Sequence, residues 1–165
     1  MSILRRLKDY LDREKVPYTV LTHEETFTAS KLAQALHVPG KEVAKVVALK
    51  VEERFVMAVL PANCKVDLKQ LISIFQTPHV RLATEEEVGG LFPDCELGAV
   101  PPFGNLYGLE VYVDRVLTGD EEIVFQAGTH HEAVKLRYQD FASLVHPQVA
   151  EFHAAASGPK TNQGG

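Results

Sequence analysis

The stretch that decides the fold runs Val43-Ala44-Lys45-Val46-Val47-Ala48-Leu49-Lys50-Val51. A turn at Glu52-Glu53 separates it from a second apolar run, Arg54 to Leu60. Two runs of this length, rich in β-branched residues and joined by a short polar turn, predict a pair of adjacent strands. The rest of the chain is therefore expected to pack around a sheet.

Helical spacing and turn residues predict the elements around this strand pair. Helices are expected over 2–15, 28–36, 68–75 after the cap residue Asp67, from the capping-box segment 84–87 onward, and from 139 onward. Short strands are expected at 18–21, 79–82, 109–113, 122–126 and 133–137. Strands interleaved with short helices in this order predict an α+β fold with a mixed, strongly curved sheet.

The length of 165 residues suits one domain with a sizeable core, and no repeat or low-complexity linker divides the chain. We assign residues 1–153 to a single domain. The small and polar segment 154–165 is expected to be a disordered tail.

The composition indicates where in the cell the protein is located and whether it binds membranes. No apolar run approaches the roughly 20 residues of a membrane span, and the N-terminus mixes charges into its apolar positions, unlike a signal peptide. The two cysteines, Cys64 and Cys95, form no CxxC pair and no disulfide framework is expected, so we predict a cytoplasmic protein that does not bind membranes.

The net charge of −5 argues against a protein that grips long stretches of nucleic acid. The first 80 residues contain 12 Lys/Arg and 9 Asp/Glu. Residues 81–165 contain 5 Lys/Arg and 13 Asp/Glu. A polyanion is therefore expected to meet the N-terminal half. The alternative is that the acidic excess serves solubility alone.

Lys45 stands inside an apolar strand. Because side chains alternate between the two faces, Lys45 shares its face with Val47 and Leu49, the bulkier side and the one expected to point inward. A lysine there is costly unless it lines a cavity or has a partner. One interpretation is a cation at the floor of a pocket, ready for a phosphate or carboxylate. The other is a side chain that extends to solvent.

A glycine- and proline-rich segment, Gly98-Ala99-Val100-Pro101-Pro102-Phe103-Gly104, falls between a predicted helix and a predicted strand. Proline stiffens such a loop and glycine permits positive φ, so its remaining N–H groups could be aimed at a carbonyl oxygen. Structural turns share this composition. The seven histidines show no HExxH spacing and lack cysteine partners, so neither a metal site nor a cofactor is expected.

These features occur together in a known family. The matching segments are 22–24 with 27–29, 38–45, 60–63 with 66–68, 98–104, 111–114 and 125–128, within roughly residues 15–145. In this ordered set the chain resembles the YbaK family of trans-editing deacylases and the homologous editing domain of bacterial prolyl-tRNA synthetases. The resemblance implies a barrel-like mixed sheet flanked by helices and an aminoacyl-tRNA deacylase that hydrolyses a misacylated tRNA, here a small amino acid on proline tRNA.

The resemblance also implies the site. Lys45 would hold the 3′ end of the tRNA, and Gly98 to Pro102 would orient the aminoacyl carbonyl. The terminal ribose hydroxyl, in place of a side-chain base, would activate water. We count Lys45, Gly98 and Pro102 as catalytic and expect further residues to bind substrate: His23, Phe27, Thr28, Ala99, Val100, Pro101, Gly128 and His130.

Some alternatives stay open. Thr28 is equally explained as a helix cap, His23 as a surface residue, and either His130 or His131 could reach the pocket. The implied partners are the acceptor end of the tRNA and an aminoacyl-tRNA synthetase, for a monomer or weak dimer. The main alternative function is a non-catalytic module that binds an aminoacyl-adenosine-like ligand or the acceptor end. A lysine Schiff-base enzyme would require a carbonyl substrate.

Overall fold

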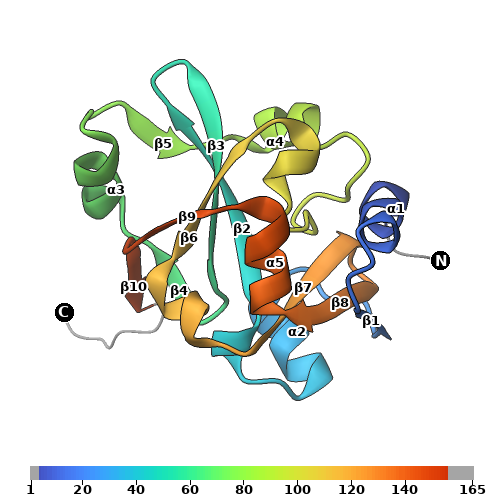
Figure 1. The fold of residues 1–165 in the computed structure, drawn as a ribbon. Helices are drawn as coiled ribbons and strands as arrows, with labels where there is room; N and C mark the ends of the chain where they lie inside the picture. Colours follow the sequence, from blue (N-terminus) through green and yellow to red (C-terminus); the bar gives the residue numbers. More distant parts are fainter. Residues whose placement is uncertain (1–3, 156–165) are drawn as a thin grey trace.

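The computed structural model describes residues 4–155 (Figure 1). The helices are α1 (Arg5–Arg13), α2 (Ala29–Leu36), α3 (Leu68–Phe75), α4 (Glu85–Leu91) and α5 (Tyr138–Val145), with 3-10 turns η1 (Gly40–Glu42), η2 (Gly104–Tyr107) and η3 (Arg115–Gly119). The strands are β1 (Thr19–Thr22), β2 (Ala44–Val51), β3 (Arg54–Pro61), β4 (Cys64–Val66), β5 (Val80–Leu82), β6 (Glu110–Asp114), β7 (Glu122–Thr129), β8 (Glu132–Arg137), β9 (Gln148–Ala150) and β10 (His153–Ala155).

The predicted strand pair forms the centre of a five-stranded sheet with the order β5-β2-β3-β6-β9. β2 and β3 are antiparallel over their whole length, from Ala44 opposite Pro61 to Val51 opposite Arg54, and cross the middle of the molecule (Figure 1). β6 lies parallel to β3, and β9 lies parallel to β6. The sheet is therefore mixed, and the expected α+β class is confirmed.

A second, three-stranded sheet has the order β1-β8-β7 and is antiparallel throughout. It meets the larger sheet at a single parallel bridge between Val43 and Val124. This bridge places the first residues of β2 against β7. As shown below, the junction of the two sheets forms the cavity that contains Lys45.

Both faces of β2 are buried, so the expectation of one inward and one outward face was too simple. Ala44 and Ala48 belong to the core that also contains residues of α1, α5, β7 and β8. Leu49 and Val51 belong to a second core beneath α3. Four residues of β2, among them Lys45, are nevertheless only half-buried, and a charged group at such a position is tolerated where it reaches a cavity or solvent.

The C-terminal boundary differs from the expected one. Ala154 and Ala155, which we assigned to the tail, belong to β10, where Ala154 lies opposite Lys65 of β4. The sequence His-Ala-Ala of this strand shows no alternating apolar pattern, and its pairing depends on a distant segment. The remaining residues of the expected disordered tail, 156–165, lie outside the described range.

Asp114 anchors this C-terminal segment from the end of β6. Its carboxylate is fully buried and accepts hydrogen bonds from the N–H groups of Val116 (3.0 Å) and Phe152 (2.8 Å) and from Nδ1 of His153 (3.0 Å). A buried carboxylate is tolerated because these donors replace its water shell.

Replacing Asp114 by asparagine should therefore destabilise the protein by about 2 kcal/mol, since an amide NH₂ would face a backbone donor where an oxygen now accepts. Urea unfolding of the two proteins measures this difference. A loss below about 0.5 kcal/mol would show that the carboxylate is not the anchor.

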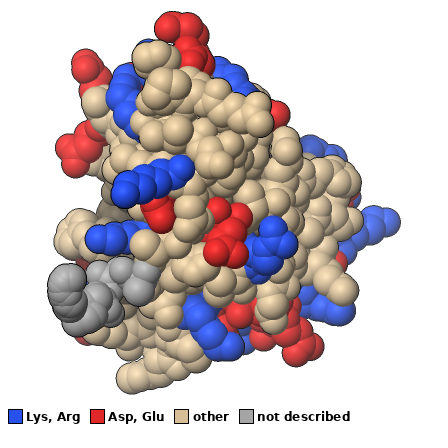
Figure 2. All heavy atoms as spheres, turned by 90° about the vertical axis from the view of Figure 1, so that its left-hand side faces the viewer, with Lys and Arg blue, Asp and Glu red and all other residues tan. Residues whose placement is uncertain are grey.

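No helix within residues 4–155 is long and apolar enough to cross a membrane. On the face that carries α3 and β10, acidic and basic side chains are interspersed (Figure 2). This face therefore does not present a continuous basic surface of the kind that long nucleic acids require.

Candidate active site

A cavity of about 210 Å³ opens along the edge of β2 that faces away from β3. Farther along this edge β5 covers the strand, where the N–H of Ala83 donates to the carbonyl of Ala48. At the beginning of the strand β7 covers it through the bridge at Val43. The cavity occupies the gap between these two covers. It is lined by Thr28, Ala29, Leu32, Ala44, Lys45, Val46, Gly98, Val100 and Gln126.

Lys45 is the charged residue of this lining and is half-buried. Burial lowers the pKa of its ammonium from the ordinary 10.5, and the nearby Cys64 opposes this only in part. Among residues 4–155, no carboxylate forms an ion pair with it. A partly desolvated cation without a protein anion is a suitable place for the anion of a ligand.

The glycine-proline loop supplies the opposite wall. Gly98 has φ +86°, a left-handed conformation that glycine adopts without strain, and both Gly98 and Val100 line the cavity. Within the described chain, the main-chain N–H groups of Gly98 and Val100 have no acceptor. Two N–H donors on the wall of a cavity that also contains a cation could bind a carbonyl oxygen and its developing negative charge.

Three other loop residues do not line the cavity, contrary to expectation. Ala99, Pro101 and Pro102 are buried beneath it. The N–H of Ala99 donates to the carbonyl of Glu96, and its own carbonyl accepts from the N–H of Gly128. The hydrogen bonds of Ala99 hold the loop in place, and Pro101 and Pro102 are buried within it.

Gly128 is likewise structural. It is buried with φ +99°, and an added Cβ would lie 2.8 Å from Cβ of Leu4. Only glycine lets β7 pass this close to the residue that precedes α1. Gly128, which we expected to bind substrate, is not among the residues that line the cavity, and it permits this close packing.

Within the segment 23–28, only Thr28 lines the cavity. Thr28 is also the N-cap of α2 and accepts a hydrogen bond from the N–H of Lys31 (3.1 Å). Phe27 is exposed beside it. His23 lies outside the cavity, where its Nδ1 contacts the carbonyl of Glu24 at 2.6 Å. Both proposed roles of Thr28 are thus compatible, and His23 is not a lining residue.

His130, which we expected to bind substrate, is buried and is not among the residues that line the cavity. Its Nδ1 lies 2.8 Å from the carbonyl oxygen of Thr26, and its Nε2 lies 2.7 Å from the carbonyl oxygen of Leu97. His130 therefore joins the two segments that contain Thr26 and Leu97, whereas His131 is exposed next to Glu25.

Sequence reasoning missed Gln126, which lines the cavity from β7. Its side chain is 5% exposed, and its Oε1 lies 3.1 Å from Nδ1 of His130. A single polar residue within the apolar run Ile123-Val124-Phe125-Gln126-Ala127 is the signal that could have identified it. The apolar lining residues Ala29, Leu32 and Ala44 carry no such signal.

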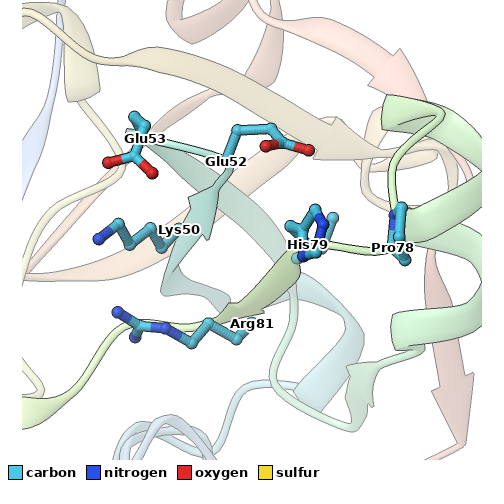
Figure 3. Close-up of a pocket in the computed structure, with 7 residues that line it drawn as sticks. Lys50, Glu52, Glu53, Pro78, His79 and Arg81 are labelled. Atoms are coloured by element: carbon cyan, nitrogen blue, oxygen red, sulfur yellow. The ribbon is translucent and has the colours of Figure 1, made fainter.

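Two other hollows lie along β2. An apolar hollow of about 210 Å³ shares Val46, Gly98 and Val100 with the Lys45 cavity and continues toward Phe92 of the turn after α4. A hollow of about 470 Å³ at the far end of β2 is lined by Lys50, Glu52, Glu53, Pro78, His79, Val80 and Arg81 (Figure 3). Its cationic and acidic side chains offset each other, and Arg81 is already paired with Glu87. We therefore place the site at Lys45.

Comparison with known proteins identifies the class. A family model described as the aminoacyl-tRNA editing domain matches residues 23–144, which include the whole cavity lining. The chain belongs to this family, as its resemblance predicted, and it is an aminoacyl-tRNA deacylase, a hydrolase that acts on misacylated tRNA.

Individual relatives agree with this class. The chain is 29% identical to the multifunctional Ser/Thr-tRNA deacylase ProXp-y of Escherichia coli, over 92% of this chain and 93% of that protein. It is 28% identical to a proline–tRNA ligase of Staphylococcus epidermidis over 63% of this chain, which corresponds to 18% of the ligase. A solved structure of a proposed trans-editing enzyme for prolyl tRNA synthetase has a TM-score of 0.80 and 25% identity, covering 92% of this chain and 97% of that one.

Proposed function

We propose that this deacylase removes small amino acids, serine and threonine foremost, from misacylated proline tRNA. In this proposal Lys45 binds the phosphate or ribose at the 3′ end of the tRNA, and the Gly98–Pro102 loop orients the acyl carbonyl. The observation that carries the proposal is the shared cavity: an unpaired, half-buried ammonium lies in one hollow with two main-chain N–H groups that have no acceptor within the described residues.

The reaction is an ester hydrolysis. The oxygen of water forms a bond to the acyl carbon, the bond between that carbon and the ribose oxygen breaks, and the ribose oxygen takes a proton. In this proposal the N–H groups of Gly98 and Val100, two residues of the cavity lining, stabilise the negative charge on the carbonyl oxygen during attack. Lys45 lowers the cost of that charge and holds the terminal nucleotide.

The cavity lining supplies no carboxylate, imidazole or thiol, since its polar side chains are those of Thr28, Lys45 and Gln126. A general base must therefore come from elsewhere. The free hydroxyl next to the ester on the terminal ribose is close to the reacting carbon in any bound pose, so the substrate itself can direct the water.

The choice of amino acid follows from the size and lining of the cavity. Ala29, Leu32, Ala44 and Val46 bound it on the apolar side, and about 210 Å³ must hold the acyl group together with the attacking water. Gln126 and Thr28 offer hydrogen-bonding groups to a side-chain hydroxyl. The relative that deacylates Ser- and Thr-tRNA supports the same choice.

A deacylation panel tests the proposal. We expect proline tRNA charged with serine, threonine or alanine to be hydrolysed, with leucine and phenylalanine esters cleaved about 100-fold more slowly because their side chains exceed the cavity. Prolyl-tRNA should be spared. The measurement is the initial rate of loss of each labelled aminoacyl-tRNA against buffer and against Lys45→Ala. If no ester is lost faster than in buffer, the proposal fails, and if leucine is removed as fast as serine, the size argument fails.

A further inference from the structure

Phe27 is unusually exposed for its type. Eight large hydrophobic side chains within residues 4–155 are exposed, and Phe27, at 63%, is the most exposed of them and the one aromatic. A single exposed apolar residue needs no explanation by itself. Phe27 needs an explanation because it lies beside the candidate active site.

Phe27 immediately precedes a residue that lines the Lys45 cavity. Its neighbour Thr28 lines both that cavity and an open hollow of about 570 Å³ in which Phe27 and Lys31 also take part. The carbonyl oxygen of Phe27 would lie 3.5 Å from a Cβ added at Gly98. The backbone of Phe27 therefore lies next to the loop that we assign to the acyl carbonyl, and its ring packs on His130, whose Cε1 would lie 3.4 Å from the same added Cβ.

The ring is also held in place from behind. Its centroid lies 4.8 Å from that of the His130 imidazole, at an interplanar angle of 53°. His130 itself is buried and is fixed by the carbonyl oxygens of Thr26 and Leu97. Phe27 thus has one side against a rigid support while much of the ring stays in contact with solvent. Such an arrangement gives up hydrophobic burial but keeps an aromatic face ready for a ligand.

We propose that Phe27 is a stacking platform for a nucleobase, namely the adenine of the terminal nucleotide of the tRNA. This inference rests on the proposed function, because the ester-bearing ribose must lie at the cavity and its base must lie within one nucleoside of it. An aromatic side chain at that distance matches the way proteins hold unpaired bases. Stacking on an aromatic face accepts any base, so the contact would strengthen binding without reading sequence.

A binding experiment isolates the platform from catalysis. The chain contains no tryptophan, so Phe27→Trp introduces a single fluorescent reporter at the proposed contact. Titration with adenosine monophosphate should quench its emission saturably, because stacking places adenine on the indole. Ribose 5-phosphate, which lacks the base, should leave the emission unchanged.

The matched control is Val149→Trp. Val149 is 48% exposed on β9, at the edge of the sheet opposite β5 and three strands from β2. Its emission should not respond saturably to either compound. Equal responses of the two tryptophans to adenosine monophosphate, or a response of Trp at position 27 to ribose 5-phosphate as large as to the nucleotide, would overturn the inference.

Kinetics provide the second test. Phe27→Ala should raise KM for the preferred aminoacyl-tRNA about 5- to 150-fold with kcat retained, since the lost contact serves binding in the ground and transition states alike. Phe27→Tyr should restore the wild-type KM. An unchanged KM for Phe27→Ala, with serine or threonine esters still cleaved by the wild type, would refute the platform alone. Failure of the wild type to cleave any ester would instead refute the proposed function, and the fluorescence titration would still decide whether a base binds at Phe27.

Discussion

Replacing Lys45 by methionine is expected to lower kcat/KM for the preferred aminoacyl-tRNA by about two to three orders of magnitude while raising the melting temperature. The loss of activity follows from removing the charge in a cavity that contains no other cation. Mutations that remove one such electrostatic contact cost about 10²–10³-fold in rate. Methionine keeps much of the aliphatic length, so the change removes charge with little change in packing.

The rise in stability follows from the lowered pKa of Lys45. Burial disfavours the charged form of this side chain in the folded protein, and the chain supplies no carboxylate within the described residues to compensate. Methionine carries no such cost. The expected gain is about 1 kcal/mol, because the side chain is only half-buried and water screens part of the penalty.

The lowered pKa of Lys45 also determines how the difference in stability between the wild type and Lys45→Met depends on pH. The unfolded chain keeps the lysine proton up to about pH 10.5, whereas the folded protein releases it at a lower pH. Between these two values the unfolded state binds more protons, so wild-type stability rises with pH relative to Lys45→Met. The advantage of the variant should therefore be largest near neutral pH and should shrink as the pH approaches 10.5.

Lys50→Met is the matched control for Lys45→Met. Lys50 lies on the same strand but lines the separate hollow near Arg81. It should leave kcat/KM within about twofold of the wild type. Rates from deacylation assays and unfolding curves at several pH values measure the predictions. Full activity of Lys45→Met, or equal losses in the two variants, would show that Lys45 has no specific part in the reaction.

Replacing Gly98 by alanine should lower kcat/KM by about 100-fold. At φ +86° an alanine is strained by about 1–2 kcal/mol. Its Cβ would lie 3.4 Å from Cε1 of His130, which is ordinary contact, so backbone strain and not a clash is the main effect. Relief of that strain would move the N–H groups at residues 98 and 100, and a displacement of about 1 Å in an active site can cost about 100-fold in rate.

Gly108→Ala is a control that separates the effect of backbone strain from the effect of a change next to the cavity. Gly108 also has positive φ, +73°, and no atom lies within 4 Å of an added Cβ, so alanine there carries similar strain away from the cavity. Both variants should lose about 1–2 kcal/mol in urea unfolding, but only Gly98→Ala should lose activity. An equal loss of activity in both would mean that general destabilisation explains the result. Retained activity in Gly98→Ala would remove the loop from the mechanism.

Local patterns in the sequence predicted most of the scaffold. The hairpin of β2 and β3, the Asp67 cap of α3 and the capping box at Thr84 all appear as expected. Each depends on residues within a few positions of one another, where hydrophobic period and capping chemistry act locally. The strands β4, β9 and β10 were not predicted; each is three residues long and pairs with a segment far away in the chain.

Lys45 marks the limit of sequence reasoning about the site. A lysine among apolar residues indicated either a side chain that lines a cavity or one that extends to solvent. The sequence of the strand alone could not distinguish these two positions. The gap between β5 and β7 along the edge of β2 creates the cavity, and three separate segments define that gap. The burial of His130 and Pro102 could not be predicted from local sequence either, because it depends on which distant segments cover these residues.

The sequence by itself therefore determined the class of fold, the family and the residue types that the site can use, since these follow from local pattern and an ordered set of motifs. Only the tertiary structure decided which of those residues face the cavity. Lys45, Gly98, Val100 and Thr28 do so, whereas Ala99, Pro101, Pro102, Gly128 and His130 support it from behind. The physical reason is that exposure to a cavity depends on the packing of segments distant in sequence, which no local pattern records.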